Sequence, residues 1–277
     1  GLYSVNTKSS FGKIEFLALL NNRIKTLYID EFDNLWIGTQ TNGLAVANLN
    51  KDREISNLSF YNYEIGLKGT IESNRISTIT EDVNGNLWIG TYNGLYLFDR
   101  LQGLFIRFDN LKNMNFPSVI FLSILPTKDG KLWVGLPGGL FELNFSNDKL
   151  EIINSYNTQN GLFNDYVTSI ISDNRGDIWL TTAGGLAKLP ANSSSFINYG
   201  KEDGIEVSSF NINSLASNES DIIFGGADGF VYFNPLQIED KLEAPDIVIT
   251  SLKINNKTVK VDEKFNARVV LNKNISY

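Results

Sequence analysis

The sequence predicts an all-β chain folded as a β-propeller of about five blades plus a partial one, and two observations carry this prediction. First, one motif returns along most of the chain: a polar turn, then Leu-Trp-Ile-Gly-Thr, then Gly-Leu, most clearly as NGNLWIGTYNGLYLFD at 84–99. Second, successive copies lie 52, 45, 46 and 44 residues apart, a period typical of propeller blades with four short strands each. The positions that mark the register are Trp36, Trp88, Trp133, Trp179 and Ile223.

Each copy predicts a strand in the interior of a sheet. Leu87-Trp88-Ile89 has no polar/apolar alternation, which is expected where a blade is covered by a neighbour on each face. Asn84-Gly85 and its counterparts tolerate the positive φ of a tight hairpin just before that strand. Apolar runs upstream predict the innermost strands at 24–29, 76–80, 120–125 and 167–171. Gly-Leu opens the third strand, and more polar fourth strands, as at 58–62 and 103–108, form the outer edge.

The two ends of the chain depart from the repeat. Gly1-Leu2-Tyr3 matches the opening of a third strand, so we expect a partial blade of third and fourth strands over 1–20, the alternative being a chance match. Five blades are expected over 21–240. After Pro235 the period stops, and 241–277 predicts a linker followed by the truncated beginning of a different β domain. On this reading the chain is part of a larger propeller.

Composition excludes several classes of function. The 277 residues include no cysteine and no histidine, which removes disulfides, thiolate chemistry, the commonest general base and the commonest transition-metal ligand. The net charge is −7, and short basic clusters do not exceed two or three residues, so nucleic acid is not an expected partner. We expect no catalytic residue, no metal and no cofactor. A run of apolar residues long enough to span a membrane is also absent from the sequence.

The copies resemble two-component regulator propeller repeats. The resemblance rests on Leu-Trp-Ile-Gly-Thr followed by Asn-Gly-Leu, on Tyr-x4-Gly between copies, and on Asp30, Asp82 or Asp173 six residues before the tryptophan. The segment 245–277 looks like the beginning of the triple-tyrosine Ig-like domain that follows such propellers. The resemblance implies the periplasmic sensor region of an inner-membrane hybrid two-component receptor that recognises oligosaccharide breakdown products of a polysaccharide. It also implies a homodimeric receptor with a downstream membrane helix and a cytoplasmic histidine kinase.

Two loops of each blade are expected on one face, around the central channel: the loop that enters the inner strand and the loop between the second and third strands. This face is the default binding surface of the fold. Arg, Asn and exposed Tyr suit a carbohydrate, whose hydroxyls need directional partners and whose ring faces stack on aromatics. The candidate ligand-binding residues are Arg23, Arg75, Tyr92, Asn93, Tyr166, Phe210 and Asn211.

The same residues have local interpretations. Asn side chains cap turns, Arg side chains pair with nearby carboxylates, and Tyr166 and Phe210 would pack between blades. The recurring tryptophans are interpreted as packing residues because they occupy one structural position.

Two other functions stay open. One is a propeller enzyme, a lyase or glycosidase, although the chain has no histidine and its acidic residues are scattered. The other is a scaffold that dimerises without binding a small ligand.

Overall fold

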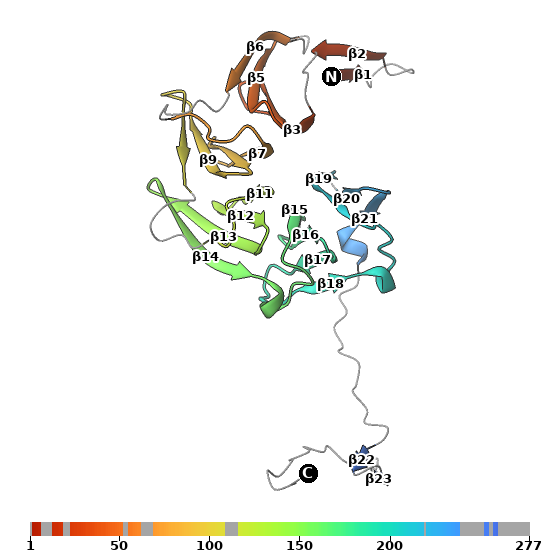
Figure 1. Cartoon of the computed structure of the whole chain (residues 1–277). Coiled ribbons are helices and arrows are strands. Elements are labelled where there is room, and N and C mark those ends of the chain that lie inside the picture. Colours follow the sequence, from red (N-terminus) through yellow and green to blue (C-terminus); the bar gives the residue numbers. More distant parts are fainter. Residues whose placement is uncertain are drawn as a thin grey trace. The chain divides into compact units, whose positions relative to one another are not determined.

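The computed structural model describes residues 2–6, 13–18, 23–51, 55–61, 69–108, 116–218, 220–238, 252–254 and 257–259 (Figure 1). The chain divides into two compact units, Gly1–Glu239 and Asp240–Tyr277. The first unit is built of antiparallel sheets in which the strands follow one another in chain order. The prediction of an all-β propeller with five blades is therefore confirmed.

The strands of the first unit group into blades. Blade 1 contains β3 (Ile24–Ile29), β4 (Asn34–Thr39), β5 (Leu44–Leu49) and β6 (Ile55–Tyr61). Blade 2 contains β7 (Ile76–Glu81), β8 (Leu87–Thr91), β9 (Gly94–Asp99) and β10 (Leu104–Arg107). Blade 3 contains β11 (Ser123–Pro126), β12 (Lys131–Leu136), β13 (Gly139–Ser146) and β14 (Lys149–Tyr156). Blade 4 contains β15 (Val167–Ser172), β16 (Ile178–Thr182), β17 (Gly185–Leu189) and β18 (Ile197–Tyr199). Blade 5 contains β19 (Phe210–Ser217), β20 (Ile222–Gly226) and β21 (Phe230–Phe233).

The remaining elements are short. β1 (Leu2–Asn6) pairs with β2 (Lys13–Ala18), and in the second unit β22 (Leu252–Ile254) pairs with β23 (Lys257–Val259). Single 3-10 turns lie at Thr158–Asn160, Lys201–Asp203 and Pro235–Gln237. Apart from the β22–β23 hairpin, the expected start of an Ig-like domain lies outside the described residues. No helix in the described parts is both long and apolar enough to traverse a lipid bilayer.

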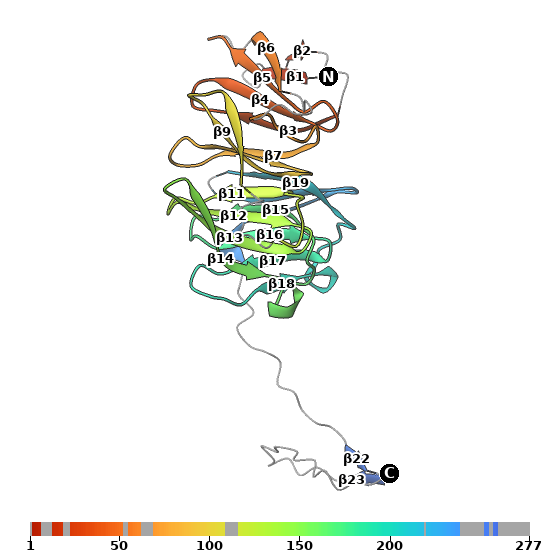
Figure 2. The same cartoon turned by 60° about the vertical axis from the view of Figure 1, so that its left-hand side comes forward.

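The innermost strands β3, β7, β11, β15 and β19 face a common axis, and the later strands of each blade lie progressively farther out (Figures 1 and 2). The tight turns before the second strands have the backbone that the sequence predicts. Gly85, Gly130 and Gly176 have φ of 79°, 84° and 84°, and Asp33 takes the corresponding place in blade 1 with φ of 59°. We call the side of the propeller on which these turns lie the turn face.

The tryptophans fill the seams between blades. Trp36, Trp88 and Trp179 are at most 2% exposed, and each packs against strands of the following blade. A tyrosine from the outer strand of the same blade stacks on the indole in three blades. Ring centroids are 6.2 Å apart for Trp36 and Tyr61, 6.0 Å for Trp133 and Tyr156, and 5.8 Å for Trp179 and Tyr199. This stacking explains why a tyrosine recurs in the Tyr-x4-Gly pattern between copies of the motif.

A carboxylate holds the indole in three blades. Asp30, Asp82 and Asp173 each accept hydrogen bonds from the backbone N–H groups two and four residues later and from the indole Nε1 six residues later. The distances from carboxylate to Nε1 are 2.8, 3.0 and 3.0 Å. One aspartate therefore satisfies the buried indole donor and fixes the hairpin turn at the same time.

Both ends of the array expose apolar side chains that the other seams bury. Leu27 on β3 is 49% exposed, whereas Ile79 at the same place in blade 2 is 4% exposed and packs beside Trp36. Phe230 on β21 is 66% exposed, whereas Leu95 at the same place in blade 2 is fully buried beside Trp88. The faces of blades 1 and 5 at the two ends of the array therefore expose residues that, in the other blades, are covered by a neighbouring blade.

Replacing Trp88 by alanine should lower the free energy of unfolding by about 3–5 kcal/mol, because it removes a fully buried aromatic side chain from a seam. Urea unfolding measures this loss. Leu101→Ala is the matched control, since Leu101 is 98% exposed and its truncation should change stability by less than about 0.5 kcal/mol. Equal losses in the two variants would contradict the packing role.

The stabilising effect of Asp30 should depend on pH. Burial alone would raise the pKa of Asp30, but hydrogen bonds from Trp36, Asn34 and Arg100 outweigh it and hold the pKa below the usual value of 3.8. A lowered pKa stabilises the folded state above the unfolded pKa, and this contribution is lost as the pH falls through the folded pKa. Urea unfolding at several pH values should show the largest stability difference between the wild type and Asp30→Asn near neutrality. A difference that stayed constant into strong acid would refute this account.

Candidate ligand-binding face

The two predicted rings of loops lie on one face. In four blades a backbone N–H in the loop between the second and third strands donates to a carbonyl just before the inner strand. These bonds join Gln40 to Arg23, Tyr92 to Arg75, Ala183 to Tyr166 and Ala227 to Ser209, at 2.9, 3.1, 3.2 and 3.0 Å. We call this surface, opposite the turn face, the axial face.

The loops of the axial face also join each blade to the next. The N–H of Gly43 donates to the carbonyl of Asn74 at 2.9 Å, and that of Gly94 donates to Val119 at 2.8 Å. Gly138 donates in the same way to Asp165 at 2.9 Å. The backbone of the face is thus held by regular hydrogen bonds, which leaves its side chains available for recognition.

Two of the candidate side chains are in contact on this face, and a third lies within electrostatic range of them. The guanidinium carbon of Arg75 lies 3.5 Å from the centroid of the Tyr92 ring, a cation–π contact within blade 2. Tyr166, from blade 4, is 37% exposed. Its pKa is raised, first by burial and then by the neighbouring Tyr92 side chain, while the positive charge of Arg75 acts in the opposite direction. An aromatic pair and a cation from two blades therefore interact electrostatically.

The other polar candidates are less clearly grouped. Asn93 is exposed, but its Nδ2 donates to the carbonyl of Glu72 at 3.1 Å, so its side chain also stabilises the local turn. Arg23 is exposed at the start of β3. Asn211 is exposed on β19, where its carbonyl accepts a hydrogen bond from Ser169 Oγ at 3.3 Å. These three stay candidates on position alone.

Phe210 is not available to a ligand. It is 9% exposed and belongs to the apolar cluster of Trp179, Ile205 and Phe224 in the seam between blades 4 and 5. Its ring meets that of Phe224 edge-on at 6.4 Å. The prediction that Phe210 binds ligand was therefore wrong, because the first residue of β19 points into the seam and not toward solvent.

A ring of small polar residues near the axis was not anticipated. The residue ten positions before each register mark is polar in all five blades: Thr26, Thr78, Ser123, Ser169 and Asn213. Ser123 Oγ accepts from the N–H of Ile170 at 3.1 Å, which joins blades 3 and 4. Ser77, which precedes Thr78, donates to the carbonyl of Phe121 across the seam between blades 2 and 3. The periodic polarity was a readable signal, and these hydroxyls serve the contacts between blades.

The described residues contain no group of three or more Asp and Glu side chains that could hold a metal ion. Among these residues the axial face therefore offers donors, acceptors and aromatic rings, which suit recognition of a polar organic ligand.

Comparison with known proteins identifies the repeat. The family described as two component regulator propeller matches residues 18–41, 70–93 and 161–184. These segments lie in the three blades in which an aspartate holds the indole. Three segments of the chain match two-component regulator propeller repeats. The recognition of these repeats from the sequence is confirmed, whereas the Ig-like part stays a prediction.

This chain spans only part of the length of the first relatives it matches, 15% of one and 36% of another. Histidine kinase P4 of Formosa agariphila is 27% identical over 264 residues, which is 94% of this chain and 15% of that protein. The extracellular domain assigned to the hybrid two-component system BT3049 of B. thetaiotaomicron is 22% identical with a TM-score of 0.72, over 94% of this chain and 36% of that one. A catalytically inactive variant of virginiamycin B lyase from Staphylococcus aureus, solved with quinupristin, is 15% identical with a TM-score of 0.59, over 83% and 71%. The structural likenesses show the propeller fold.

The coupling on the axial face can be tested by titration. Removing the cation in Arg75→Ala should raise the pKa of Tyr166 further, because the guanidinium favours the tyrosinate. Tyrosinate absorbance against pH measures this shift, and subtracting the curve of Tyr166→Phe isolates one residue among eleven tyrosines. If the pKa of Tyr166 were unchanged in Arg75→Ala, the guanidinium would not act on Tyr166, and the proposed coupling would be wrong.

Proposed function

We propose that this chain is an extracytoplasmic ligand-sensing part of a hybrid two-component receptor and that it recognises oligosaccharides released from a polysaccharide. On this proposal the region is periplasmic, the intact receptor is a homodimer in the inner membrane, and binding is relayed to a cytoplasmic histidine kinase. Support comes from the regulator propeller repeats and from the 27% identical relative named a histidine kinase. Solved extracellular domains of hybrid two-component systems share the fold.

The observation that carries the ligand class is the group formed by Arg75, Tyr92 and Tyr166. A guanidinium over one aromatic ring, with a second exposed tyrosine within electrostatic range, offers both hydrogen bonds and a stacking surface. Sugars use both kinds of contact, since their hydroxyls need directional partners and their C–H faces pack on aromatic rings. The surrounding backbone is fixed by hydrogen bonds, so these side chains are presented on a rigid base.

An enzymatic function is not favoured by a specific observation. The lyase with a similar fold is described as catalytically inactive when one histidine is replaced by alanine. This chain has no histidine, so it does not use a histidine in that way. Turnover of any oligosaccharide in the binding assay below would favour an enzyme.

Calorimetry with a panel of oligosaccharides tests the proposal. At least one should bind, and Arg75→Ala and Tyr166→Ala should each weaken its binding about tenfold, equivalent to about 1.4 kcal/mol. Lys149→Ala, which removes an exposed cation from the outer strand of blade 3, is the matched control and should leave affinity unchanged. If the two axial variants bound as tightly as the control, the axial face would not be the site.

A further inference from the structure

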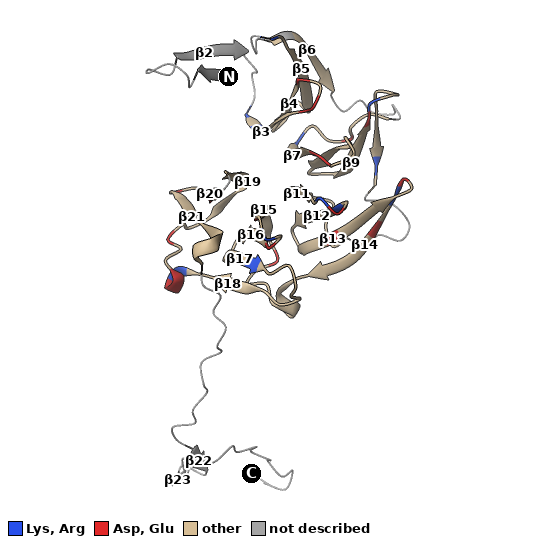
Figure 3. Ribbon diagram, turned by 180° about the vertical axis from the view of Figure 1, so that it is seen from behind, with Lys and Arg blue, Asp and Glu red and all other residues tan. Residues whose placement is uncertain are grey.

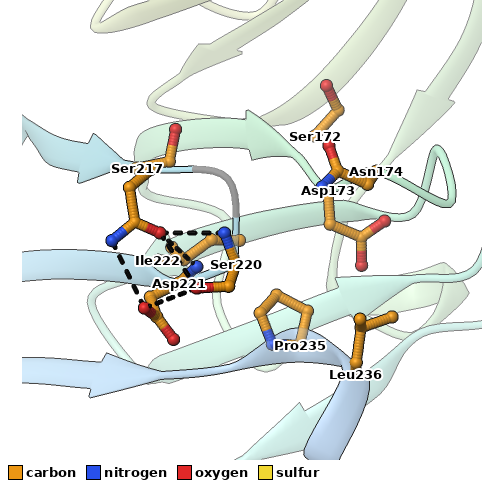
Figure 4. A pocket seen from close by; sticks show the side chains of 10 residues that line it. Ser172, Asp173, Asn174, Ser217, Ser220, Asp221, Ile222, Pro235 and Leu236 are labelled. Atoms are coloured by element: carbon orange, nitrogen blue, oxygen red, sulfur yellow. Dashed lines mark hydrogen bonds between the residues drawn. The ribbon is translucent and has the colours of Figure 1, made fainter.

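The turn face carries a pocket in the seam between blades 3 and 4, which we call the seam pocket. Its volume is about 910 Å³, and its polar lining includes Asp129, Lys131, Trp133, Glu142, Asn154 and Asn174. The corresponding pocket in the seam between blades 4 and 5 is far smaller, about 70 Å³, and is bordered by Asp173, Asp221 and Pro235 (Figure 4). One seam is therefore open where its neighbour is nearly closed.

The pocket arises where the repeat loses its aspartate. Residue 127 is threonine at the position of Asp30, Asp82 and Asp173. Thr127 Oγ1 lies 2.5 Å from Asp129 Oδ1 and 3.1 Å from the carbonyl of Lys131, so it completes the turn without holding the indole. Trp133 is only 7% exposed and lines the pocket, yet none of the described residues accepts a hydrogen bond from its Nε1.

The side chains that close other seams are also missing here. Arg100 spans blades 1 and 2 with contacts of 2.8 Å to Asp30 and 2.5 Å to Glu81. Phe233 packs on Trp179 with ring centroids 4.7 Å apart. By strand register the counterpart of Phe233 in blade 4 is Leu189, and that of Arg100 is Ala191. Two smaller residues therefore leave the space beside Trp133 unfilled.

The pocket contains a buried acceptor beside this unused donor. Glu142 is 5% exposed, and its carboxylate receives hydrogen bonds from Lys131 Nζ at 2.7 Å and Asn154 Nδ2 at 2.6 Å. Ile178 and Leu189 form part of the apolar lining. Lys128 and Asp129 line the pocket at the β11–β12 turn, where the ribbon of Figure 3 is coloured for basic and acidic residues. Directional donors and acceptors around an apolar base match a polyhydroxylated ring.

We propose that the seam pocket is a binding site for a neutral sugar unit, with Trp133 Nε1 donating to a sugar oxygen and Glu142 accepting from a hydroxyl. This proposal takes its ligand class from the proposed function but names a different site. A neutral sugar is favoured over a sugar acid because the lining carries three carboxylates, Asp129, Glu142 and Asp173, against the ammonium groups of Lys128 and Lys131.

Thr127→Asp is the decisive variant. It restores the aspartate of the other blades, which should capture the Trp133 indole and block the pocket, so that the protein melts at a higher temperature while seam binding is lost. Trp133→Phe keeps an aromatic ring but removes the donor, and it should weaken binding at least about tenfold. Trp88→Phe is the matched control, because the Trp88 donor is already used by Asp82 at 3.0 Å and neither residue lines the pocket.

Calorimetry with neutral mono-, di- and trisaccharides separates this proposal from the axial one. Binding that is lost in Thr127→Asp and Trp133→Phe but retained in Arg75→Ala supports the seam pocket. Binding that is lost only in Arg75→Ala overturns the seam pocket and leaves the proposed function standing. The absence of binding to every neutral sugar overturns the seam pocket as well, and binding of sugar acids alone would overturn its preference for a neutral ligand.

Discussion

The structure depends on burying one indole in each seam, and in three of the four seams an aspartate pairs with the indole N–H group. A tryptophan buried between two sheets contributes a large apolar surface, but its donor loses water and must find an acceptor. Asp82 meets this need for Trp88 and also binds the two backbone N–H groups of the preceding turn. Because the same carboxylate orders the hairpin and orients the indole, a short local motif determines how one blade meets the next.

Periodic features could be predicted from the sequence because each blade uses the same hydrophobic pattern and the same type of turn. The register of Trp36 and Trp88, the glycine turns and the innermost strands follow from hydrophobic pattern and turn chemistry. The burial of Phe210 could not be predicted in this way. Whether the first residue of a strand points into a seam or toward water depends on the neighbouring sheet. The electrostatic influence of Arg75 on Tyr166 depends on how blades 2 and 4 are placed around the axis, which local sequence does not encode.

The exposed ends of the array follow from the same constraint. Blades 2, 3 and 4 each receive the tryptophan of the preceding blade on one face and present their own tryptophan to the next blade on the other. Leu27 has no such neighbour among the described residues and is half exposed, while Ile79, Ile124 and Ile170 at the same place are at most 6% exposed. Since exposed apolar faces of this kind are costly in water, they favour association with a further blade or sheet.

Departures from a repeat are informative because the repeat defines what each position must supply. In blade 3 the indole is still packed as in the other blades, since Trp133 stacks on Tyr156 and is largely buried. The indole N–H of Trp133 has no aspartate acceptor, because residue 127 is threonine. The space beside it stays open because the side chains of blade 4 at this place are small. A blade that keeps its packing but leaves its donor unused remains stable enough to fold and has hydrogen-bonding capacity available for a ligand. Because the indole can be buried without its N–H being paired within the protein, one seam of a repetitive protein can differ in function from the others.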